Sequence, residues 1–580
     1  MRNSHKAAIV AMLGVATTAT LTVLAFDKDN DYNRIAKNID LFCDVVKQTN
    51  MLYVDTINID KHTETAINAY LYDLDPYTEY IPERDQEDFM TVSTGEYGGI
   101  GTPIQKIKDG KFGEGTYVTG PYEDSPAYNA GLRSGDMLWK INSDTVTSWP
   151  VEKVSKTLRG DANTPVTVTV KRPYTADSIR TFDIVRKKIE VRPVPYYGVV
   201  RGNVGYISIK TFNEKTGREV KNALTELKAN PAVKSIVLDL RDNGGGLVDQ
   251  AVSVAGLFLP KGTLVLEMKG RLKQSDKVYK TTQEPVDTKI PLAVFINGNS
   301  ASASEILAGA LQDHDRAVII GSRSYGKGLV QSTRPIAHNG LVKVTIAKYY
   351  IPSGRLIQAI DYSHRNADGE AERVPDSLTT AYKTDHGRTV RDGHGITPDI
   401  AVEQKQYSSV FLKAMSYNLI FDYANRYAAA HPDGIGRIED FTVTDEMYED
   451  FIKGVDGKKF GENKACEKEI DKLRKVAEVE GYLNDSTRVA IDNLAKMLHQ
   501  DYATDLRTNR ADISKYIALE IVERYYFERG QLMQMLKSDT TMDRAKEMFD
   551  KAGEYERILG LASASTQKAS KSAKAAKKKK

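Results

Sequence analysis

The chain has 580 residues, which is too long for one ordinary hydrophobic core, so several domains are expected. Its composition, with 41% hydrophobic and 27% charged residues, is that of a soluble globular protein. The formal net charge of +3 does not indicate nucleic-acid binding by the whole protein. Two distant cysteines and nine scattered histidines form no disulfide framework and no metal motif, so neither a metal nor an organic cofactor is expected.

The N-terminus has the features of an export segment. Arg2 and Lys6 precede an apolar run, AAIVAMLGVATTATLTVLAF, that ends at Phe26. The run fits a secretory signal, and it is also about long enough for an uncleaved membrane anchor. We expect residues 1–26 to direct export to a bacterial periplasm or cell envelope, and anchoring in the inner membrane stays open.

Residues 27–88 are predicted to form an N-terminal helical region. Apolar residues recur there at three-to-five spacing, as at Ile35, Ile39 and Phe42. The segment LDPYTEYIP, which contains two prolines, then interrupts the helical pattern.

Residues 89–175 are predicted to form a small β-rich domain. A glycine-rich turn in YGGIGTPIQKI enters an alternating strand, and SPAYNAGLRSGDMLWKIN adds a short helix, a Gly-Asp turn and another strand. The A-G-L-x-x-G-D pattern at this distance from GGIG resembles a PDZ domain, whereas GGIG alone would fit ordinary turn glycines. In that fold, backbone N–H groups of a loop receive a peptide's C-terminal carboxylate, and the peptide adds as a strand. The resemblance places this loop at Gly98, Gly99, Ile100 and Gly101.

Residues 176–405 read as alternating strands and helices. SIVLDL and PLAVFI are typical of buried parallel strands, each followed by a loop and a helix, and ligands of such sheets bind at the carboxyl ends of the strands. From 406 to 560 helix formers dominate, which predicts a C-terminal helical domain. The Ala/Ser/Lys-rich residues 561–580 are expected to be disordered. The predicted fold is therefore multidomain α/β with helical regions at both ends.

The stretch GSRSYGKGLVQ contains the pattern G-x-x-x-x-G-K of a phosphate-binding loop. Gly328 stands where that motif needs a hydroxyl for magnesium, and the residues that follow Lys327 suit a strand better than a helix. A phosphate site is therefore disfavoured.

The stretch SASASEILAGALQD predicts a serine exposed at a strand-to-helix turn. The helix N-terminus there offers positive potential to a developing oxyanion. The nearest histidine, His314, lies at the far end of this helix, and G-x-S-x-G is absent, so a Ser-His-Asp triad is poorly supported. A lysine can replace the histidine when burial disfavours its charged form, and Lys327 is the candidate.

These motifs closely resemble those of the C-terminal processing, or tail-specific, serine proteases. SASASEI, YGKGLVQ, LDPYTEY, DLRDNGGGL, YYIPSGRLIQ and GITPD occur in the family's order over about residues 35–402. The resemblance implies that Ser302 is the nucleophile, that Lys327 is the general base 25 residues downstream, and that Gln331 is a third residue able to orient the lysine. The implied oxyanion donors are the N–H groups of Ala303 and of Gly244 or Gly245.

Other readings of these residues remain. Ser302 could be only a helix cap. Asp239 and Arg241 are best read as a structural ion pair that positions the glycine loop, rather than as an acid/base pair. Tyr349 and Tyr350 are expected to line the substrate groove or to pack in the core.

The sequence thus predicts an exported Ser/Lys endopeptidase that acts on proteins with free C-termini, captured by the PDZ domain. Membrane association through the N-terminus and assembly into homo-oligomers are compatible with it, and nucleic acid is not expected as a partner. The alternative is a non-catalytic envelope scaffold, in which a PDZ adaptor sits on an inactive protease-like core.

Overall fold

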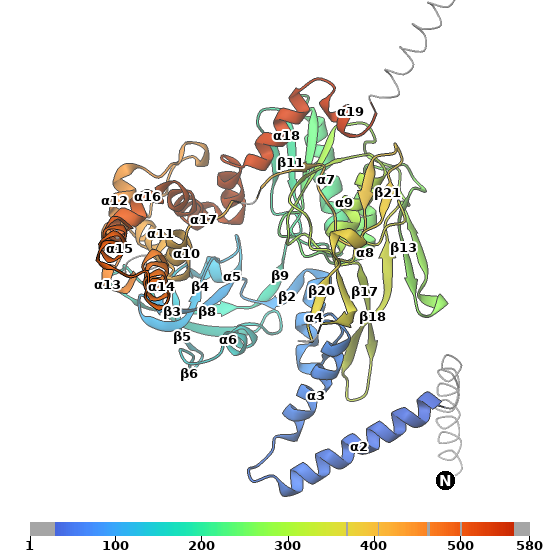
Figure 1. Ribbon diagram of the computed structural model, residues 1–580, viewed down its shortest axis with the longest axis horizontal. Coiled ribbons are helices and arrows are strands. Elements are labelled where there is room, and N and C mark those ends of the chain that lie inside the picture. Colours follow the sequence, from blue (N-terminus) through green and yellow to red (C-terminus); the bar gives the residue numbers. More distant parts are fainter. Residues whose placement is uncertain (1–29, 367–368, 404, 461–464, 499–500, 562–580) are drawn as a thin grey trace, which may run out of the picture. The chain divides into compact units, whose positions relative to one another are not determined.

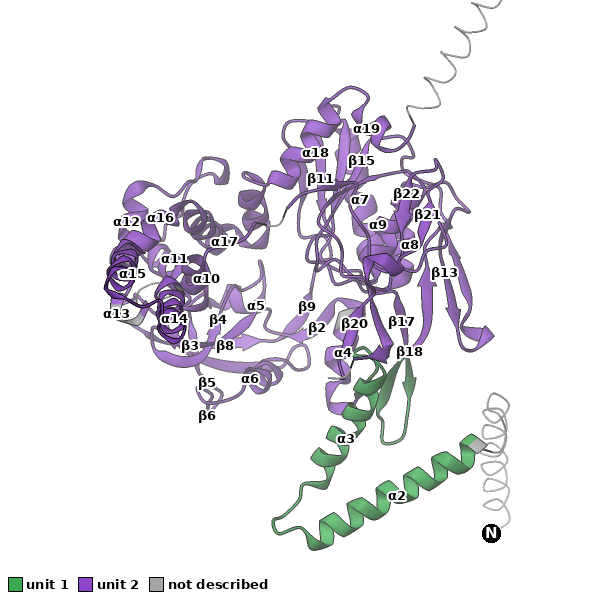
Figure 2. Ribbon diagram, viewed as in Figure 1, with its two compact units in different colours: residues 1–80, 333–344 green, residues 81–332, 345–580 purple. Residues whose placement is uncertain are grey.

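The computed structural model describes residues 30–366, 369–403, 405–460, 465–498 and 501–561. The expected export segment and most of the lysine-rich tail lie outside the described residues. The chain divides into two compact units, residues 1–80 with 333–344 and residues 81–332 with 345–580 (Figure 2). Within the described residues, no helix combines the length and apolarity needed to cross a membrane.

The first unit contains the predicted N-terminal helices, α2 (Asn30–Leu52) and α3 (Ile59–Leu74). Asp75, in the LDPYTEY segment, forms the turn that follows α3. Its carboxylate accepts the backbone N–H of Thr78 at 2.8 Å and the Thr78 hydroxyl at 3.0 Å. The motif therefore ends the helix and leads into β1 (Glu79–Ile81).

The predicted β-rich domain is a sheet in the order β3-β4-β5-β7-β8, with β6 beside β5. A two-stranded ribbon of β2 and β9 adjoins it in sequence, and the helices are α4, α5 and α6. The bounds are α4 (Gln86–Thr94), β2 (Glu96–Gly99), β3 (Ile104–Gly110), β4 (Gly113–Val118), α5 (Pro126–Ala130), β5 (Met137–Ile141), β6 (Asp144–Thr145), α6 (Val151–Leu158), β7 (Pro165–Lys171), β8 (Ile179–Val185) and β9 (Lys187–Glu190).

Asp136 is the last residue of the A-G-L-x-x-G-D motif of this domain. This carboxylate is fully buried, and it accepts hydrogen bonds from the Arg172 guanidinium at 2.6 and 2.7 Å and from the backbone N–H of Arg133 at 2.9 Å. Burial raises the pKa of Asp136, and the Arg172 charge opposes that rise. The aspartate thus ties the turn to the end of β7.

The predicted α/β region is built on a six-stranded sheet in the order β10-β11-β12-β15-β16-β23. All pairs are parallel except β10 with β11. Every residue of β11, β12, β15 and β16 is buried, as expected where both faces of a parallel sheet are covered. The bounds are β10 (Tyr197–Val200), β11 (Val204–Ser208), β12 (Ser235–Asp239), β15 (Leu292–Ile296), β16 (Val318–Gly321) and β23 (Ile400–Ala401).

Different parts of the chain cover the two faces of this sheet (Figure 1). One face packs against α7 (Thr216–Ala229), α8 (Val248–Ala255) and α9 (Ala303–Asp313). The other packs against the end of α17 (Arg510–Leu536) and against α18 (Thr540–Asp550). Side chains of this second core include Tyr206, Val237, Phe295, Ile320, Leu536, Met542, Ala545 and Met548.

Around the main sheet lie smaller strands. Strand β18 pairs with β13 and β17, and β14 pairs with β13. The bounds of these strands and of two short hairpins are β13 (Leu264–Gly270), β14 (Lys277–Lys280), β17 (Leu329–Pro335), β18 (Leu341–Tyr350), β19 (Ile360–Arg365), β20 (Ala371–Arg373), β21 (Ala381–Lys383) and β22 (Thr389–Arg391).

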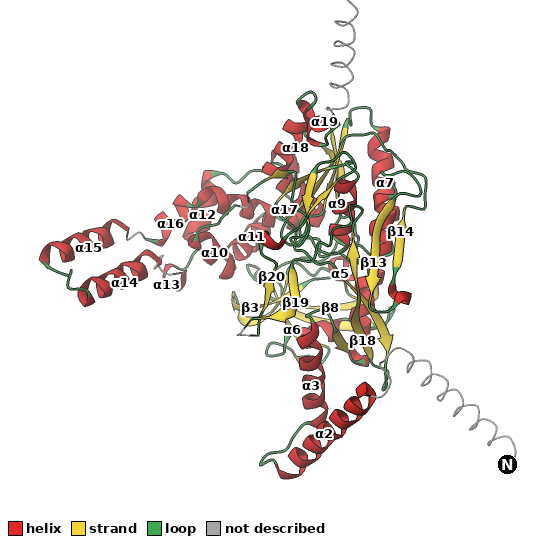
Figure 3. Ribbon diagram, turned by 45° about the vertical axis from the view of Figure 1, so that its right-hand side comes forward, coloured by secondary structure: helices red, strands yellow, loops and turns green. Residues whose placement is uncertain are grey.

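The C-terminal region is helical, as predicted (Figure 3). Its own core is rich in aromatic side chains, among them Phe411, Tyr423, Tyr448 and Phe451. The remaining helices are α10 (Ser409–Ser416), α11 (Leu419–Ala430), α12 (Asp445–Lys453), α13 (Gly457–Phe460), α14 (Ala465–Val479), α15 (Asp485–Leu498), α16 (Tyr502–Thr508) and α19 (Glu554–Ile558).

Candidate active site

Ser302 lies at the strand-to-helix turn that the sequence predicted, between the end of β15 and the start of α9. Its backbone has φ 55° and ψ −113°, a conformation that costs energy for a residue with a side chain. Ser302 is partly exposed, whereas its neighbours Ala301 and Ala303 are buried. The strained turn thus presents the hydroxyl at the N-terminus of a helix, where the positive end of the dipole favours an anion.

Glu305, which the sequence reasoning did not single out, connects the two predicted catalytic segments. One carboxylate oxygen accepts the backbone N–H of Ser302 at 2.8 Å and that of Lys327 at 2.9 Å. The other accepts the Ser324 hydroxyl at 2.5 Å and the Gly326 N–H at 2.7 Å. Glu305 is fully buried, and this burial raises its pKa to about 7.

Because one buried carboxylate binds the main chain of Ser302 and of Lys327, the two residues lie at the same site. The sequence did contain a signal for this role. Ser302 and Glu305 have the S-x-x-E spacing of a capping box, in which the acidic side chain accepts the N–H of the capping residue.

Tyr349 braces the same two segments from β18. Its hydroxyl lies 2.5 Å from the carbonyl oxygen of Lys327 and 3.3 Å from that of Ser302. Its backbone N–H donates to Gly328 at 3.0 Å, and its side chain is buried. Of the two roles expected for this tyrosine, packing in the core is the one observed.

Lys327 is partly buried and directly precedes the glycine that enters β17. The neighbouring glycines are required by close packing, because a Cβ on Gly326 would lie 2.3 Å from the Cβ of Ala359. Gln331 follows on β17 and donates its amide to the Thr345 hydroxyl at 3.0 Å. This bond fixes the Gln331 side chain, and its orienting effect on Lys327 stays a prediction.

The glycine loop after β12 lies against Ser302, the predicted nucleophile. A Cβ on Gly245 would stand 2.8 Å from that of Ser302 and 2.9 Å from the backbone nitrogen of Ala303. The N–H of Gly245 donates to Asn243 at 2.9 Å, whereas Gly244 is exposed, with open space around it. Gly244 and Ala303, the first residue of α9, are therefore the better candidates for oxyanion donors.

Asn243 and the residues beside it hold this loop to the turn that carries Ser302. The Asn243 carbonyl accepts the N–H of Ala301 at 3.0 Å and the Ser304 hydroxyl at 2.9 Å. Asp239, at the end of β12, forms the expected ion pair with Arg241, with nitrogen and oxygen 2.5 Å apart. The position of the glycine loop thus depends on contacts with the end of β12, the turn that carries Ser302 and the start of α9.

The four residues of the predicted carboxylate loop in the β-rich domain lie in different surroundings. Gly98 and Gly99 belong to β2, and a Cβ on Gly98 would lie 2.3 Å from the carbonyl oxygen of Gly160. Ile100 is buried in the domain's core, and Gly101 has φ 75°, which favours glycine. Binding of a peptide carboxylate here stays a prediction.

A metal site is not indicated by the described part of the chain, because no three His, Cys, Asp or Glu side chains in it gather as metal ligands.

Three family models match the chain. Peptidase family S41 matches residues 203–363, a PDZ domain matches 117–172, and a model described as "Probable PDZ-protease, C-terminal helical domain" matches 412–549. These matches and the fold define a serine peptidase that carries a PDZ domain. The chain belongs to peptidase family S41.

Two similar proteins and one solved structure add detail. The chain is 36% identical over 409 residues to a carboxy-terminal-processing protease of Bartonella bacilliformis, covering 68% of this chain and 82% of that protein. It is 32% identical over 404 residues to a "Probable CtpA-like serine protease" of Staphylococcus aureus, covering 68% and 72%. The structure of the photosystem II D1 C-terminal processing protease is 27% identical, with coverage of 63% and 92% and a TM-score of 0.34.

Membership of the family bears out the enzyme class predicted from the sequence: the chain is a serine peptidase.

Proposed function

We propose that this chain is an exported endopeptidase that cleaves proteins near their C-termini, with Ser302 as nucleophile and Lys327 as general base. The observation that carries the proposal is that the backbones of both residues are bound by one side chain. The Glu305 carboxylate accepts the backbone N–H of both, which supports assigning the two residues to one site.

The mechanism follows from the groups around Ser302. The neutral amine of Lys327 takes the hydroxyl proton while the Ser302 oxygen attacks the peptide carbonyl. The negative charge that develops on the carbonyl oxygen is stabilised by the N–H of Ala303, with the α9 dipole behind it, and by that of Gly244. The protonated lysine then gives its proton to the leaving amine, and a water molecule hydrolyses the acyl-enzyme by the same route.

The PDZ domain supplies the second half of the proposal. Its loop at Gly98–Gly101 would bind the substrate's C-terminal carboxylate and add the peptide as a strand, as this class of domain does. The solved PDZ domain of a carboxy-terminal protease from Vibrio cholerae, similar over 16% of this chain, was crystallised with a peptide. The same binding would hold the substrate and raise its local concentration at Ser302.

The dyad is tested on an unstructured protein that ends in apolar residues. Wild type should degrade it, whereas Ser302→Ala and Lys327→Ala should each lower the rate by at least about 10³-fold. Folding of both variants is checked by thermal unfolding. Equal degradation by all three proteins, or by none, would contradict the assignment.

Capture of the C-terminus is tested with one peptide in two forms, a free carboxylate and a C-terminal amide. The amide should raise KM about tenfold or more, because it removes the charge that the loop's N–H groups bind. Equal KM values would exclude carboxylate capture and leave the dyad unaffected. Export is tested separately, by whether residues 1–29 carry a fused reporter enzyme across the inner membrane of a bacterium.

A further inference from the structure

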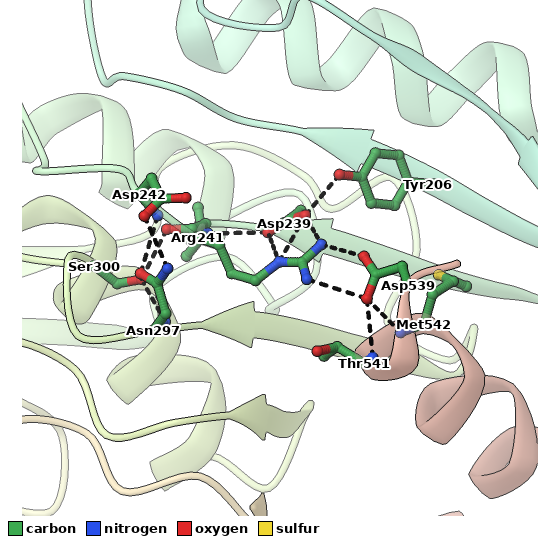
Figure 4. Close-up of polar contacts among 10 residues, drawn as sticks. Tyr206, Asp239, Arg241, Asp242, Asn297, Ser300, Asp539, Thr541 and Met542 are labelled. Carbon is green, nitrogen blue, oxygen red and sulfur yellow. Dashed lines mark hydrogen bonds and ion pairs between the residues drawn. The ribbon is translucent and has the colours of Figure 1, made fainter. Parts of the chain in front are cut away.

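The end of strand β12 is joined to the C-terminal helical region by a buried ion network (Figure 4). Arg241 lies between two carboxylates. One is Asp239, two residues earlier, and the other is Asp539, nearly 300 residues later and adjacent to α18. Both carboxylates are buried.

The contact between Arg241 and Asp539 is bidentate. One guanidinium nitrogen lies 2.6 Å from one Asp539 oxygen, and a second nitrogen lies 3.2 Å from the other. The same guanidinium holds Asp239 at 2.5 and 2.9 Å. Burial lowers the pKa of Arg241, but the two carboxylates outweigh this effect and raise the pKa well above its ordinary value. A planar guanidinium held on both edges has one orientation, which is the property that bidentate arginine pairs provide.

Capping of α18 does not by itself explain an aspartate at position 539. Asp539 is the N-cap, and its carboxylate accepts the N–H of Thr541 at 2.9 Å and of Met542 at 3.2 Å. Asparagine or serine would cap as well, without the cost of a buried charge. The carboxylate adds the bidentate ion pair with Arg241.

Arg241 in turn begins the loop that faces the nucleophile. The next residue, Asp242, has φ 61°, and it exchanges hydrogen bonds of 3.0 and 2.9 Å with Asn297. The loop then continues through Asn243 and Gly244 to Gly245, which contacts Ser302. A shift of Arg241 would therefore move the backbone N–H groups proposed to bind the oxyanion.

We propose that Asp539 is a positioning residue for catalysis, through which the C-terminal helical region fixes the glycine loop beside Ser302. The inference rests on the proposed function, because it assigns the loop to transition-state binding. Helix α18 then helps to position the active-site loop, in addition to covering one face of the sheet.

The test uses the full chain with two substitutions that keep the helix cap and remove the charge, Asp539→Asn and Asp539→Ser. The matched control is Asp543→Asn, on the same helix, which removes the ion pair with Arg201 (2.9 Å) that does not touch the glycine loop. Steady-state cleavage of a C-terminally free peptide gives kcat and KM, and a fluorophosphonate probe gives the rate at which Ser302 is modified.

We expect both Asp539 variants to lower kcat by about tenfold or more, with KM within about twofold of wild type and slower modification of Ser302 in parallel. Asp543→Asn should keep wild-type kcat. Wild-type kcat in a folded Asp539 variant would overturn the inference, as would variants that unfold at 25 °C, since the residue would then be a stability element. If instead wild type fails to cleave, or Ser302→Ala cleaves equally well, the proposed function fails.

Discussion

At the scale of single residues, the site is organised by two buried side chains, Glu305 and Tyr349. Glu305 accepts four hydrogen bonds, two of them from the backbone N–H groups of Ser302 and Lys327. The Tyr349 hydroxyl lies within hydrogen-bond distance of the carbonyl oxygens of the same two residues. Together they hold the peptide groups on both sides of Ser302 and Lys327. This matters for the proposed dyad, because a flexible hydroxyl and amine gain their rate from alignment.

Glu305 should make stability depend on pH. Burial raises its pKa from 4.5 to about 7, so between these values the folded protein holds a proton that the unfolded chain has released. Protonation thus favours the folded state, and stability is lost as pH rises from about 4.5 to 7. From pH 4 to pH 8, wild type should lose about 3 kcal/mol more of its unfolding free energy than Glu305→Gln.

The measurement is urea unfolding of both proteins across this pH range. Parallel pH profiles for the two proteins would show that the Glu305 pKa is not raised. Activity gives an independent readout at pH 8. There Glu305→Gln should be slower, because its amide would place a donor against the donors that the carboxylate accepts.

Tyr349→Phe should lower kcat about tenfold with little change in KM, because it removes the hydroxyl that fixes the Lys327 carbonyl. The stability cost should be about 1 kcal/mol, the usual net value of one hydrogen bond. Tyr423→Phe is the matched control. It removes a buried hydroxyl bound to the Met447 carbonyl at 2.7 Å in the helical region, so it should cost similar stability and no activity. Equal kcat values for Tyr349→Phe and Tyr423→Phe would show that Tyr349 does not position Lys327.

At the scale of elements, the loops that follow β12 and β15 form one unit around Ser302. Gly245 has φ 104°, and any Cβ there would meet Ser302 and the backbone of Ala301 at 2.8 Å. Gly245→Ala should therefore reduce activity by more than about 100-fold and destabilise the fold.

The control for Gly245→Ala is Gly298→Ala, in the turn before Ser302. The nearest heavy atom to a Cβ there is the Arg323 carbonyl oxygen at 4.0 Å, so the substitution should be tolerated. Cleavage rates and thermal midpoints of the two variants are compared with wild type. An active Gly245→Ala would show that the two loops can move apart without loss of catalysis.

The elements around the site were predictable to different degrees. Strand β12 and the turn before α9 followed from apolar runs and from small residues, since both are local signals. Gly245 could be assigned to the site but not separated from Gly244, because only the three-dimensional contacts show which glycine touches Ser302. Tyr349 could not be assigned to Lys327, because a hydrogen bond from β18 to the loop before its neighbour β17 leaves no periodic pattern in the sequence.

At the scale of the whole second unit, the sequence predicted a protease core followed by a helical domain. The order of the regions is as predicted, but the last helices also complete the core. They cover the second face of the parallel sheet with Leu536, Met542 and Met548, among others. An amphipathic helix such as α18 shows in its sequence that one face is buried, but not against what. Its position on the sheet therefore had to come from the structure.

Shortening the C-terminus tests this dependence. A chain that ends at residue 536 lacks α18 and α19, so it exposes the apolar face formed by Val237, Phe295 and Ile320. Parallel sheets are stable only when both faces are covered, so this chain should lose its cooperative thermal transition and aggregate.

A chain that ends at residue 561 is the control, because it keeps both helices and removes only residues 562–580. It should unfold at the same temperature as the full chain and cleave at the same rate. A soluble, active chain ending at residue 536 would show that the protease core is complete without its C-terminal cover. It would also contradict the positioning role of Asp539, since the glycine loop would then keep its geometry with Arg241 held by Asp239 alone.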